Sequence, residues 1–236
     1  MKIVIVSREK ESINELKEEI LDIDDSVKIV EKDPDIVISY GGDGTFLVAE
    51  RLFPSIPKLL LRKSSICKLC EDGNTYEIIK RVIEGKIIKN IYPKLEAKIN
   101  SRLIPLKSIN DIIIRNKNQY ESLRFDTIIN DQTMQNIIGD GVVISTPFGS
   151  TGYFYSITRK NFEKGIGIAF NNPTSHQDYI IKDDLNIKIK ISRGEAIISF
   201  DNIPEIHESK EGDIIEIFTS KENFTTIRVK SDKEIS

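Results

Sequence analysis

The segment with the greatest chemical potential joins a strand-like run to a helix-like run. Its residues are Gly41, Gly42, Asp43, Gly44 and Thr45. Glycines there let the backbone approach a ligand closely, and a helix N-terminus offers N–H groups to phosphate. A carboxylate beside phosphates, such as Asp43, holds Mg²⁺ or takes a proton from an attacking hydroxyl. The segment therefore suits phosphoryl transfer, although Asp-Gly is also common in simple turns.

A second polar segment, "IGDGVVISTPFGSTGYFYS" at 138–156, runs from a turn through a strand into a loop. The hydroxyls of Thr146, Ser150 and Thr151 follow the strand and suit a ribose or an adenine edge. Ser150 or Thr151 is expected to cap the next helix, and Tyr153 can stack on a base. Alternatively, this segment is only a capped turn followed by a core tyrosine.

The elements that must position these segments change character along the chain. Up to about residue 87, short apolar runs alternate with helical periodicity, which predicts a parallel, doubly wound sheet. Strands are expected at 2–6, 27–30, 36–39 and 59–61, and helices from 9, at 46–52 and from Asn74 or Thr75. In such a sheet, ligands bind beyond the carboxyl ends of the strands.

From residue 87 onward, alternating strands separated by turns dominate, with one helical interruption after Gly149. Strands are expected at 95–99, 109–115, 123–129, 142–145, 166–170, 185–191, 196–200 and 214–218. The sequence thus predicts an α/β domain at 1–88, which carries the glycine segment, and a β-rich domain at 89–236.

Composition narrows the possible partners. The chain has 236 residues, a formal net charge of −3 and 30% charged residues. This indicates a soluble protein without the basic surface of a nucleic-acid binder. The apolar stretch 3–6 is too short for a signal peptide or a membrane span, so we expect a cytoplasmic protein with no membrane partner. Cys67 and Cys70 form one C-x-x-C pair, and we expect them to be structural or incidental rather than zinc ligands.

The two glycine-containing segments together resemble those of the NAD kinase family. "GGDGT" at 41–45 and "GDGVVISTPFGSTGY" at 139–153 carry the resemblance, with "SINDIII" at 108–114 between them. "NNPTSHQDYIIKDDLNIKI" at 171–189 and "AIISFDN" at 196–202 extend it across most of the chain. The resemblance implies an α/β N-terminal domain, a β-rich NAD-binding C-terminal domain, and transfer of a phosphoryl group from ATP or polyphosphate to the 2′-hydroxyl of the adenosine ribose of NAD.

The resemblance also implies roles for individual residues. Asp43 would orient or deprotonate the acceptor hydroxyl. The donor phosphates would bind at Gly41, Gly42, Gly44 and Thr45. NAD would be bound by Asn110, Asp111, Asp140, Thr151, Gly152, Tyr153 and His176. The family uses Mg²⁺ or another divalent cation and assembles as a homodimer or homotetramer. The metal ligands are not assigned, with Asp111 and Asp140 as candidates for a metal or a hydroxyl.

Two departures from the family pattern keep other functions open. Residues 57–72 lack the glycines and the asparagine that wall the site in many members, and Phe148 occupies a position that is usually small and hydroxyl-bearing. The alternatives are a non-catalytic paralogue that binds NAD(P) or an adenine nucleotide, and another kinase with a GGDGT segment, such as a lipid kinase or a phosphofructokinase.

Overall fold

The computed structural model divides the chain into two compact units. The first unit comprises Met1–Ile91 and Asn223–Ser236, and the second comprises Tyr92–Glu222. The structure describes residues 1–63, 70–130, 132–175, 179–183, 186–230 and 234. Two strands, β5 (Ile87–Ile99) and β16 (Ile214–Val229), contribute residues to both units.

The first unit is built on a parallel sheet with the strand order β2-β1-β3-β4-β16. Its elements are β1 (Lys2–Val6), α1 (Lys10–Ile23), β2 (Lys28–Ile29), β3 (Ile36–Gly41), α2 (Asp43–Leu52), β4 (Lys58–Arg62) and α3 (Thr75–Ile83). In register, Val6 lies opposite Ser39, and Gly41 lies opposite Arg62. The carboxyl ends of β1, β3 and β4 therefore meet at one edge of the sheet.

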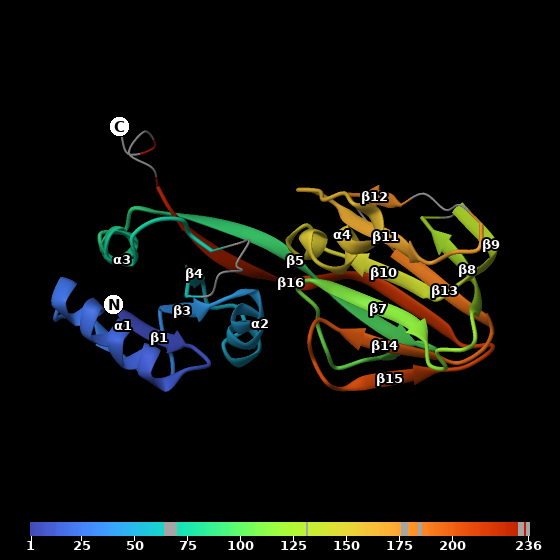
Figure 1. Ribbon diagram of the computed structural model, residues 1–236, viewed down its shortest axis with the longest axis horizontal. Helices are drawn as coiled ribbons and strands as arrows, with labels where there is room; N and C mark the ends of the chain where they lie inside the picture. The colour runs from blue at the N-terminus through green and yellow to red at the C-terminus, as the bar shows by residue number, and fades with distance from the viewer. Residues whose placement is uncertain (64–69, 131, 176–178, 184–185, 231–233, 235–236) are drawn as a thin grey trace. The chain divides into compact units, whose positions relative to one another are not determined.

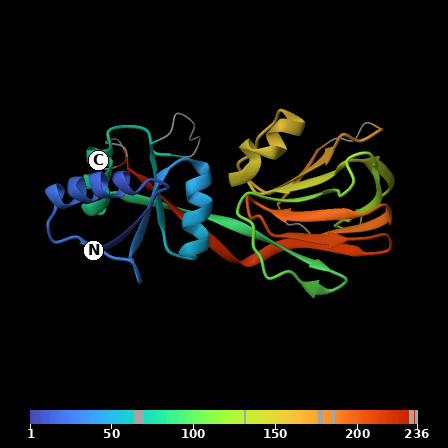
Figure 2. The same ribbon diagram turned by 60° about the horizontal axis from the view of Figure 1, so that its bottom comes forward.

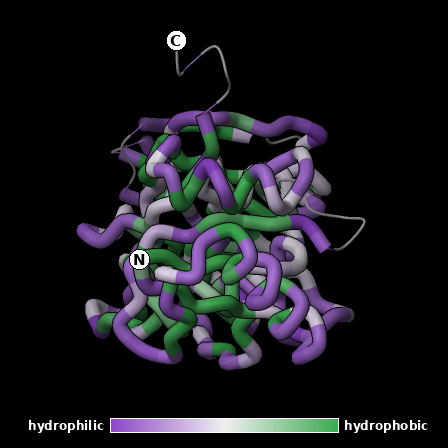
Figure 3. Tube along the Cα trace, turned by 90° about the vertical axis from the view of Figure 1, so that its left-hand side faces the viewer, coloured by the Kyte–Doolittle hydropathy of each residue, from purple (hydrophilic) through white to green (hydrophobic). Residues whose placement is uncertain are grey.

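Helices cover both faces of this sheet, as the predicted doubly wound arrangement requires. Ile5 and Ile38 face a core cluster that includes Leu16 of α1 and Ile78 of α3. Residues of the opposite parity, such as Val37, pack instead with α2. Figure 1 shows the three helices around strands β1, β3 and β4, and Figure 3 shows hydrophobic segments enclosed by hydrophilic ones. Alternating side chains thus hold helices on two faces of one sheet.

The second unit consists of antiparallel strands in two layers (Figure 2). Its elements are β6 (Arg102–Leu103), β7 (Asp111–Asn116), β8 (Leu123–Ile129), β9 (Gln132–Gly139), β10 (Gly141–Ser145), η1 (Phe148–Thr151), α4 (Tyr153–Thr158), β11 (Ile166–Asn171), β12 (Ile180–Lys182), β13 (Asn186–Arg193), β14 (Ala196–Phe200) and β15 (Ile206–Ser209). One layer has the order β12-β11-β10-β7-β14-β15, and the other contains β16-β13-β8-β9. Ile144 and Ile189 belong to the core between the layers.

The fold class expected from the sequence is confirmed, whereas several element boundaries differ from the expectation. Helix α2 begins at Asp43, three residues before the expected Phe46, so the carboxylate lies in the first turn of the helix. Strands β6, β9, β12 and β15 were not expected. Asn74 does cap α3, because the backbone N–H of Glu77 donates to its Oδ1 at 3.3 Å. None of the helices in the described residues is long and apolar enough to cross a membrane.

Candidate functional site

A cavity of about 520 Å³ lies at the carboxyl ends of three neighbouring strands in the first unit. It is lined by 7–9 after β1, by 40–45 around the end of β3, and by Lys63 directly after β4. Strand β1 lies between β2 and β3 in the sheet. The chain moves from β1 through α1 to β2 on one side, and then to β3 on the other side. The cavity thus lies at a topological switch point, where ligands of doubly wound sheets bind, and its volume suits a small molecule.

The GGDGT segment forms the helical wall of this cavity. Gly42 is the N-cap residue of α2, and no side chain caps the helix there. The backbone N–H groups of Thr45 and Phe46 donate to the carbonyl of Gly42 at 2.9 and 3.3 Å. The first turn of α2 therefore begins with Asp43 and Gly44, where helix N–H groups and the helix dipole favour a bound anion.

Gly41 is required by close packing rather than by an unusual backbone angle. A Cβ atom at this position would lie 2.4 Å from Oγ1 of Thr45. The side chain of Thr45 is buried, so it cannot easily move aside. The glycine therefore allows strand β3 to pass directly into the first turn of α2.

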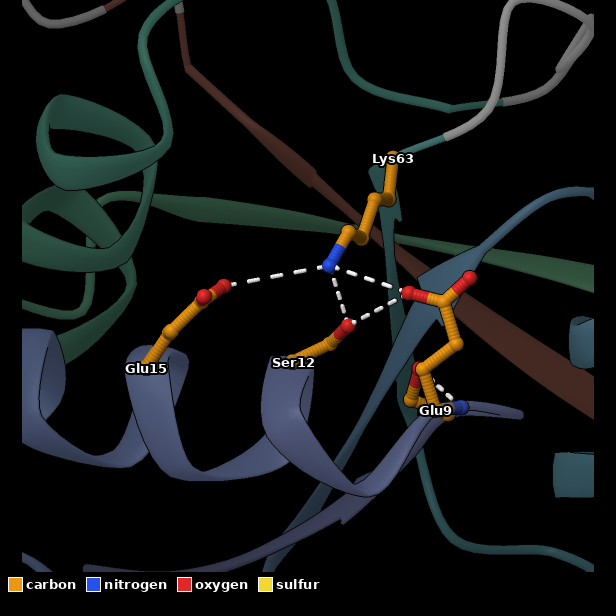
Figure 4. A network of polar contacts seen from close by, with 5 residues as sticks. Glu9, Ser12, Glu15 and Lys63 are labelled. Atoms are coloured by element: carbon orange, nitrogen blue, oxygen red, sulfur yellow. Dashed lines mark hydrogen bonds and ion pairs between the residues drawn. The ribbon is translucent and has the colours of Figure 1, made fainter.

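Arg8 and Lys63 also line the cavity. These two cations were not identified from the sequence. Nζ of Lys63 lies 3.2 Å from Oε2 of Glu9 and also donates to the hydroxyl of Ser12 (Figure 4). The ammonium of Lys63 lowers the pKa of Glu9, and Glu9 raises the pKa of Lys63, each mainly through their hydrogen bond. The available signal was position: Arg8 lies two residues after β1, Lys63 directly follows β4, and both strands pair with β3.

In the second unit, Asp201 fixes the loop that leads into β7. Its Oδ1 accepts hydrogen bonds from the hydroxyl of Ser108 at 2.5 Å and from the backbone N–H of Asn110 at 2.9 Å. Its Oδ2 accepts from the N–H of Ile109 at 3.0 Å. Burial raises the pKa of Asp201, while the donors from the loop act in the opposite direction. This carboxylate was not proposed as a site residue, although "FDN" at its strand end belongs to the resemblance.

The loop before β7 contacts the polar loop after β10. The N–H of Thr146 donates to the carbonyl of Asn110 at 2.8 Å, and its hydroxyl donates to the carbonyl of Ile109 at 2.6 Å. A Cβ atom on Gly149 would lie 2.3 Å from the carbonyl oxygen of Asn110. Oδ1 of Asn110 is buried and has no hydrogen-bond partner among the described residues. That side chain is thus positioned to accept a hydrogen bond from a ligand hydroxyl.

Asp111 is 7% exposed and begins β7 beside this loop. Burial, with a smaller contribution from the charge of Asp201, raises the pKa of Asp111 to about 7. A carboxyl group with such a pKa changes its protonation state near neutral pH, which is a common property of functional sites.

The structure does not bring every predicted NAD-binding residue together. Asp111 lies opposite Ser145, whereas Asp140 precedes Gly141 at the far end of β10. Five residue steps along a strand separate these positions by about 17 Å. Nδ2 of Asn172 donates to Asp140 at 3.2 Å, and Nδ2 of the neighbouring Asn171 donates to the hydroxyl of Tyr153 at 3.0 Å.

The loop after β10 differs in detail from the expectation. Gly152, not Ser150 or Thr151, is the N-cap residue of α4, and the hydroxyl of Ser150 donates to the carbonyl of Phe162 at 3.1 Å. Gly152 is exposed, and Thr151 and Tyr153 are half-buried. Phe148 is buried, and its ring packs edge-on against Tyr92 with the centroids 5.5 Å apart.

Two predictions fall on residues that the structure does not describe. His176 and Cys67 lie outside the described residues. Among those described, no group of three or more His, Cys, Asp or Glu side chains is arranged to hold a metal ion.

The first unit presents a carboxylate in the first turn of a helix at the strand ends, and the second presents buried polar groups in a loop. These features suit a nucleotide-dependent phosphotransferase. The ATP-NAD kinase C-terminal domain matches residues 109–229, about half of the chain. The NAD kinase of Sulfurisphaera tokodaii is 33% identical over 85% of this chain and 84% of that protein. The chain belongs to the NAD kinase family.

Other relatives and solved structures agree with this assignment. The bifunctional NADP phosphatase/NAD kinase of Methanocaldococcus jannaschii is 30% identical over 76% of this chain. The matched region spans 33% of that longer protein. The structure of an NAD kinase from Archaeoglobus fulgidus in complex with ATP has a TM-score of 0.78 at 17% identity and covers 99% of this chain and 95% of that one. Yeast NADH kinase complexed with NADH gives 0.82 at 17% identity, covering 99% and 84%. At these identities the structures establish the shared fold.

Proposed function

We propose that the chain transfers a phosphoryl group from ATP to the 2′-hydroxyl of the adenosine ribose of NAD and so produces NADP. The observation that carries this proposal is the placement of Asp43 in the first turn of α2, inside the cavity at the strand ends. The solved relatives with ATP and with NADH, and the NAD kinases among the sequence relatives, support the choice of donor and acceptor.

The donor phosphates are proposed to bind at the start of α2. Gly41, Gly42, Gly44 and Thr45 form the proposed phosphate-binding segment. Gly42 and Gly44 have no side chain to block a phosphate, Gly41 and Thr45 pack together where β3 passes into the helix, and the first helical turn directs N–H groups at an anion. Inorganic polyphosphate carries the same phosphate chain as ATP and is the alternative donor. Positioning and charge neutralisation supply most of the catalysis in phosphoryl transfer.

Asp43 is proposed to orient the attacking hydroxyl and accept its proton. A carboxylate suits this role because it accepts hydrogen bonds without donating any when it is ionised. The acceptor nucleoside is proposed to bind at the loops of the second unit, where Oδ1 of Asn110 is buried and lacks a partner among the described residues. Asp111, Asp140, Thr151, Gly152, Tyr153 and His176 complete the proposed NAD-binding set.

The residues of the cavity fit a divalent cation bound mainly by the donor. Mg²⁺ typically takes one or two protein carboxylates together with substrate phosphates and water. Glu9 and Asp43 are the described carboxylates that line the cavity, and either would contribute an oxygen to such a cation. When bound, the cation would neutralise charge on the transferred phosphoryl group.

The direct test measures NADP formation from NAD with ATP and MgCl₂. Asp43→Asn should lower kcat by a factor of about 10² or more, the scale of a lost general base. Asp33→Asn is the matched control, because Asp33 is exposed in the turn before β3 and its φ of 51° suits asparagine. Equal rates for the wild-type protein and Asp43→Asn would refute the role of Asp43. Tight nucleotide binding without turnover would favour the non-catalytic alternative.

The assembly is proposed to be a homodimer or homotetramer. Strand β12 is an edge strand in the sheet order, and Ile181 within it and Tyr179 directly before it are exposed. Edge strands with apolar side chains tend to pair or to be covered. Light scattering coupled to size exclusion should give two or four times the mass of one chain, and a single-chain mass would refute the proposal.

A further inference from the structure

The ammonium of Lys63 is held in the cavity by groups from another element. Glu9, Ser12 and Glu15 converge on it from the start of α1 (Figure 4). Its Nζ lies 3.8 Å from Oε2 of Glu15 and 5.8 Å from the ring centroid of Tyr40. The side chain of Lys63 is 34% exposed, so solvent and ligands can reach it.

An anionic ligand in this cavity would meet side chains of both charges. Arg8 and Lys63 bring positive charge to the cavity, while Glu9 and Asp43 bring negative charge. A chain of phosphates at the start of α2 is attracted by Lys63 and repelled by Glu9. The carboxylate of Glu9 pairs with the same ammonium that would otherwise be available to the phosphates.

The ion pair between Lys63 and Glu9 is weak enough to be exchanged. The side chain of Glu9 is 69% exposed, and exposed pairs of this kind change an equilibrium by no more than about fivefold. A phosphate chain carries several charges and many acceptor oxygens, and charge-assisted contacts to phosphate are stronger than those between neutral groups. A bound phosphate chain can therefore displace Glu9 at small cost.

We infer that Lys63 binds the polyphosphate chain of the phosphoryl donor and that Glu9 is an internal competitor for the Lys63 ammonium. The inference rests on the proposed function, because it places the donor phosphates in this cavity. The ligand chemistry is a linear polyphosphate, supplied either by a nucleoside triphosphate or by inorganic polyphosphate. A purely structural ion pair makes a different prediction, since removing Glu9 would then leave ligand affinity unchanged.

Calorimetric titration with inorganic tripolyphosphate and, separately, with ATP tests this inference at a fixed MgCl₂ concentration. Lys63→Met should weaken both ligands about tenfold, the scale of one charge-assisted contact. Glu9→Gln should tighten both two- to fivefold, because it removes the competitor. In the Lys63→Met background, Glu9→Gln should have a smaller effect than in the wild-type background. Glu11→Gln, exposed on the same helix outside the cavity lining, is the control and should leave both affinities unchanged.

Several outcomes would overturn the inference. Wild-type protein that does not bind tripolyphosphate, unchanged affinity in Lys63→Met, or weaker binding in Glu9→Gln would each do so. A response with ATP alone would show that Lys63 acts on the nucleoside rather than on the phosphate chain. Circular dichroism melting curves identify any variant that is unfolded, and Lys63→Arg, which keeps the charge, then provides the comparison and should retain most of the affinity.

The titration separates this inference from the proposed reaction. Tripolyphosphate binding is measured without NAD, so it can follow the predicted pattern even when no NADP forms. In that case the Lys63 assignment stands and the reaction is wrong. Normal NADP formation with unchanged tripolyphosphate affinity in Lys63→Met would refute the Lys63 assignment alone.

Discussion

Asp111 and Asp201 are joined by two hydrogen bonds that run in opposite directions. The N–H of Asp201 donates to the carbonyl of Asp111 at 3.0 Å, and the N–H of Asp111 donates to Oδ1 of Asp201 at 3.2 Å. Asp201 has a left-handed φ of 48°, which lets the turn after β14 place its carboxylate under the loop before β7. Two carboxyl groups are thereby buried together at the start of β7, and burial of both favours their neutral forms.

This arrangement predicts a pH-dependent contribution to stability from Asp111. Its pKa is about 7 in the folded protein and has an ordinary value of 3.8, so between these values the folded state holds more protons than the unfolded state. The free energy of unfolding should therefore fall as pH rises from about 4 to 7, by at most about 1.4 kcal/mol per pH unit from this group. Between pH 5 and pH 7, the free energy of unfolding measured in urea should decrease less for Asp111→Asn than for the wild-type protein.

The comparison must be made between variants, because other groups also titrate in this range. Asp33→Asn replaces an exposed aspartate and should retain the wild-type pH dependence. An Asp111→Asn variant with the same decrease from pH 5 to pH 7 as the wild-type protein would show that Asp111 is ionised throughout.

The contact between Gly149 and Asn110 predicts a severe effect of a single methyl group. In Gly149→Ala the new Cβ would meet three backbone atoms of Asn110, at 2.3, 2.5 and 2.6 Å. Backbone atoms cannot rotate away, so the loop must shift, at a cost of about 1–3 kcal/mol. Denaturant unfolding should show this loss, and the KM for NAD should rise. Gly152→Ala is the matched substitution in the same loop, and its nearest contact is 3.2 Å. Equal losses of unfolding free energy in Gly149→Ala and Gly152→Ala would contradict the proposed role of the Gly149 contact.

Gly41→Ala tests the equivalent close approach in the first unit. The added Cβ would lie 2.4 Å from Oγ1 of Thr45 and should displace the first turn of α2. Because the donor phosphates are proposed to bind at that turn, the KM for ATP should rise more than the KM for NAD. In a Thr45→Ala background, which lacks Oγ1, Gly41→Ala should raise the KM for ATP less than it does in the wild-type background. An equal rise in the two backgrounds would show that the steric contact is not the cause.

Local pattern was sufficient for the elements whose side chains alternate cleanly. Strands β8 and β14 have the predicted bounds, because every second residue is buried and all of these except Thr127 are apolar. The same signal is weak in β9, where most of the first five side chains are exposed and Asn136 adopts a left-handed φ of 56°. A polar run with a turn-like residue does not identify a strand unless its pairing with β8 is known.

The candidate site shows a similar limit. The glycines and Asp43 were recognisable because three glycines around a carboxylate are unusual at the end of a buried strand. The early start of α2 was not, because glycine and aspartate are poor helix formers whose cost is lowest in the first turn. Arg8 and Lys63 are ordinary polar residues after strands, and only the register of β1, β3 and β4 assigns them to one cavity. Nor does sequence pattern show that Thr226 and Ile227 of β16 pair with β4.

Lys58 provides a test of the frame that supports the cavity. This lysine is fully buried in β4, where Nζ donates to the carbonyls of Phe53 and Ile56 at 2.6 and 2.7 Å and pairs with the carboxylate of Glu50 in α2. It thereby ties the end of α2 to the strand that precedes Lys63. Lys58→Met keeps most of the side-chain volume but leaves the Glu50 carboxylate buried without its cation, which should lower the free energy of unfolding by about 3–5 kcal/mol. Urea denaturation measures this loss.

Two further variants control for this prediction. Lys58→Met/Glu50→Gln, which removes both charges, should lose less stability than Lys58→Met. Lys28→Met on the exposed strand β2 should change stability by less than about 0.5 kcal/mol. A double variant that is less stable than Lys58→Met alone would show that the uncompensated charge of Glu50 is not the source of the loss.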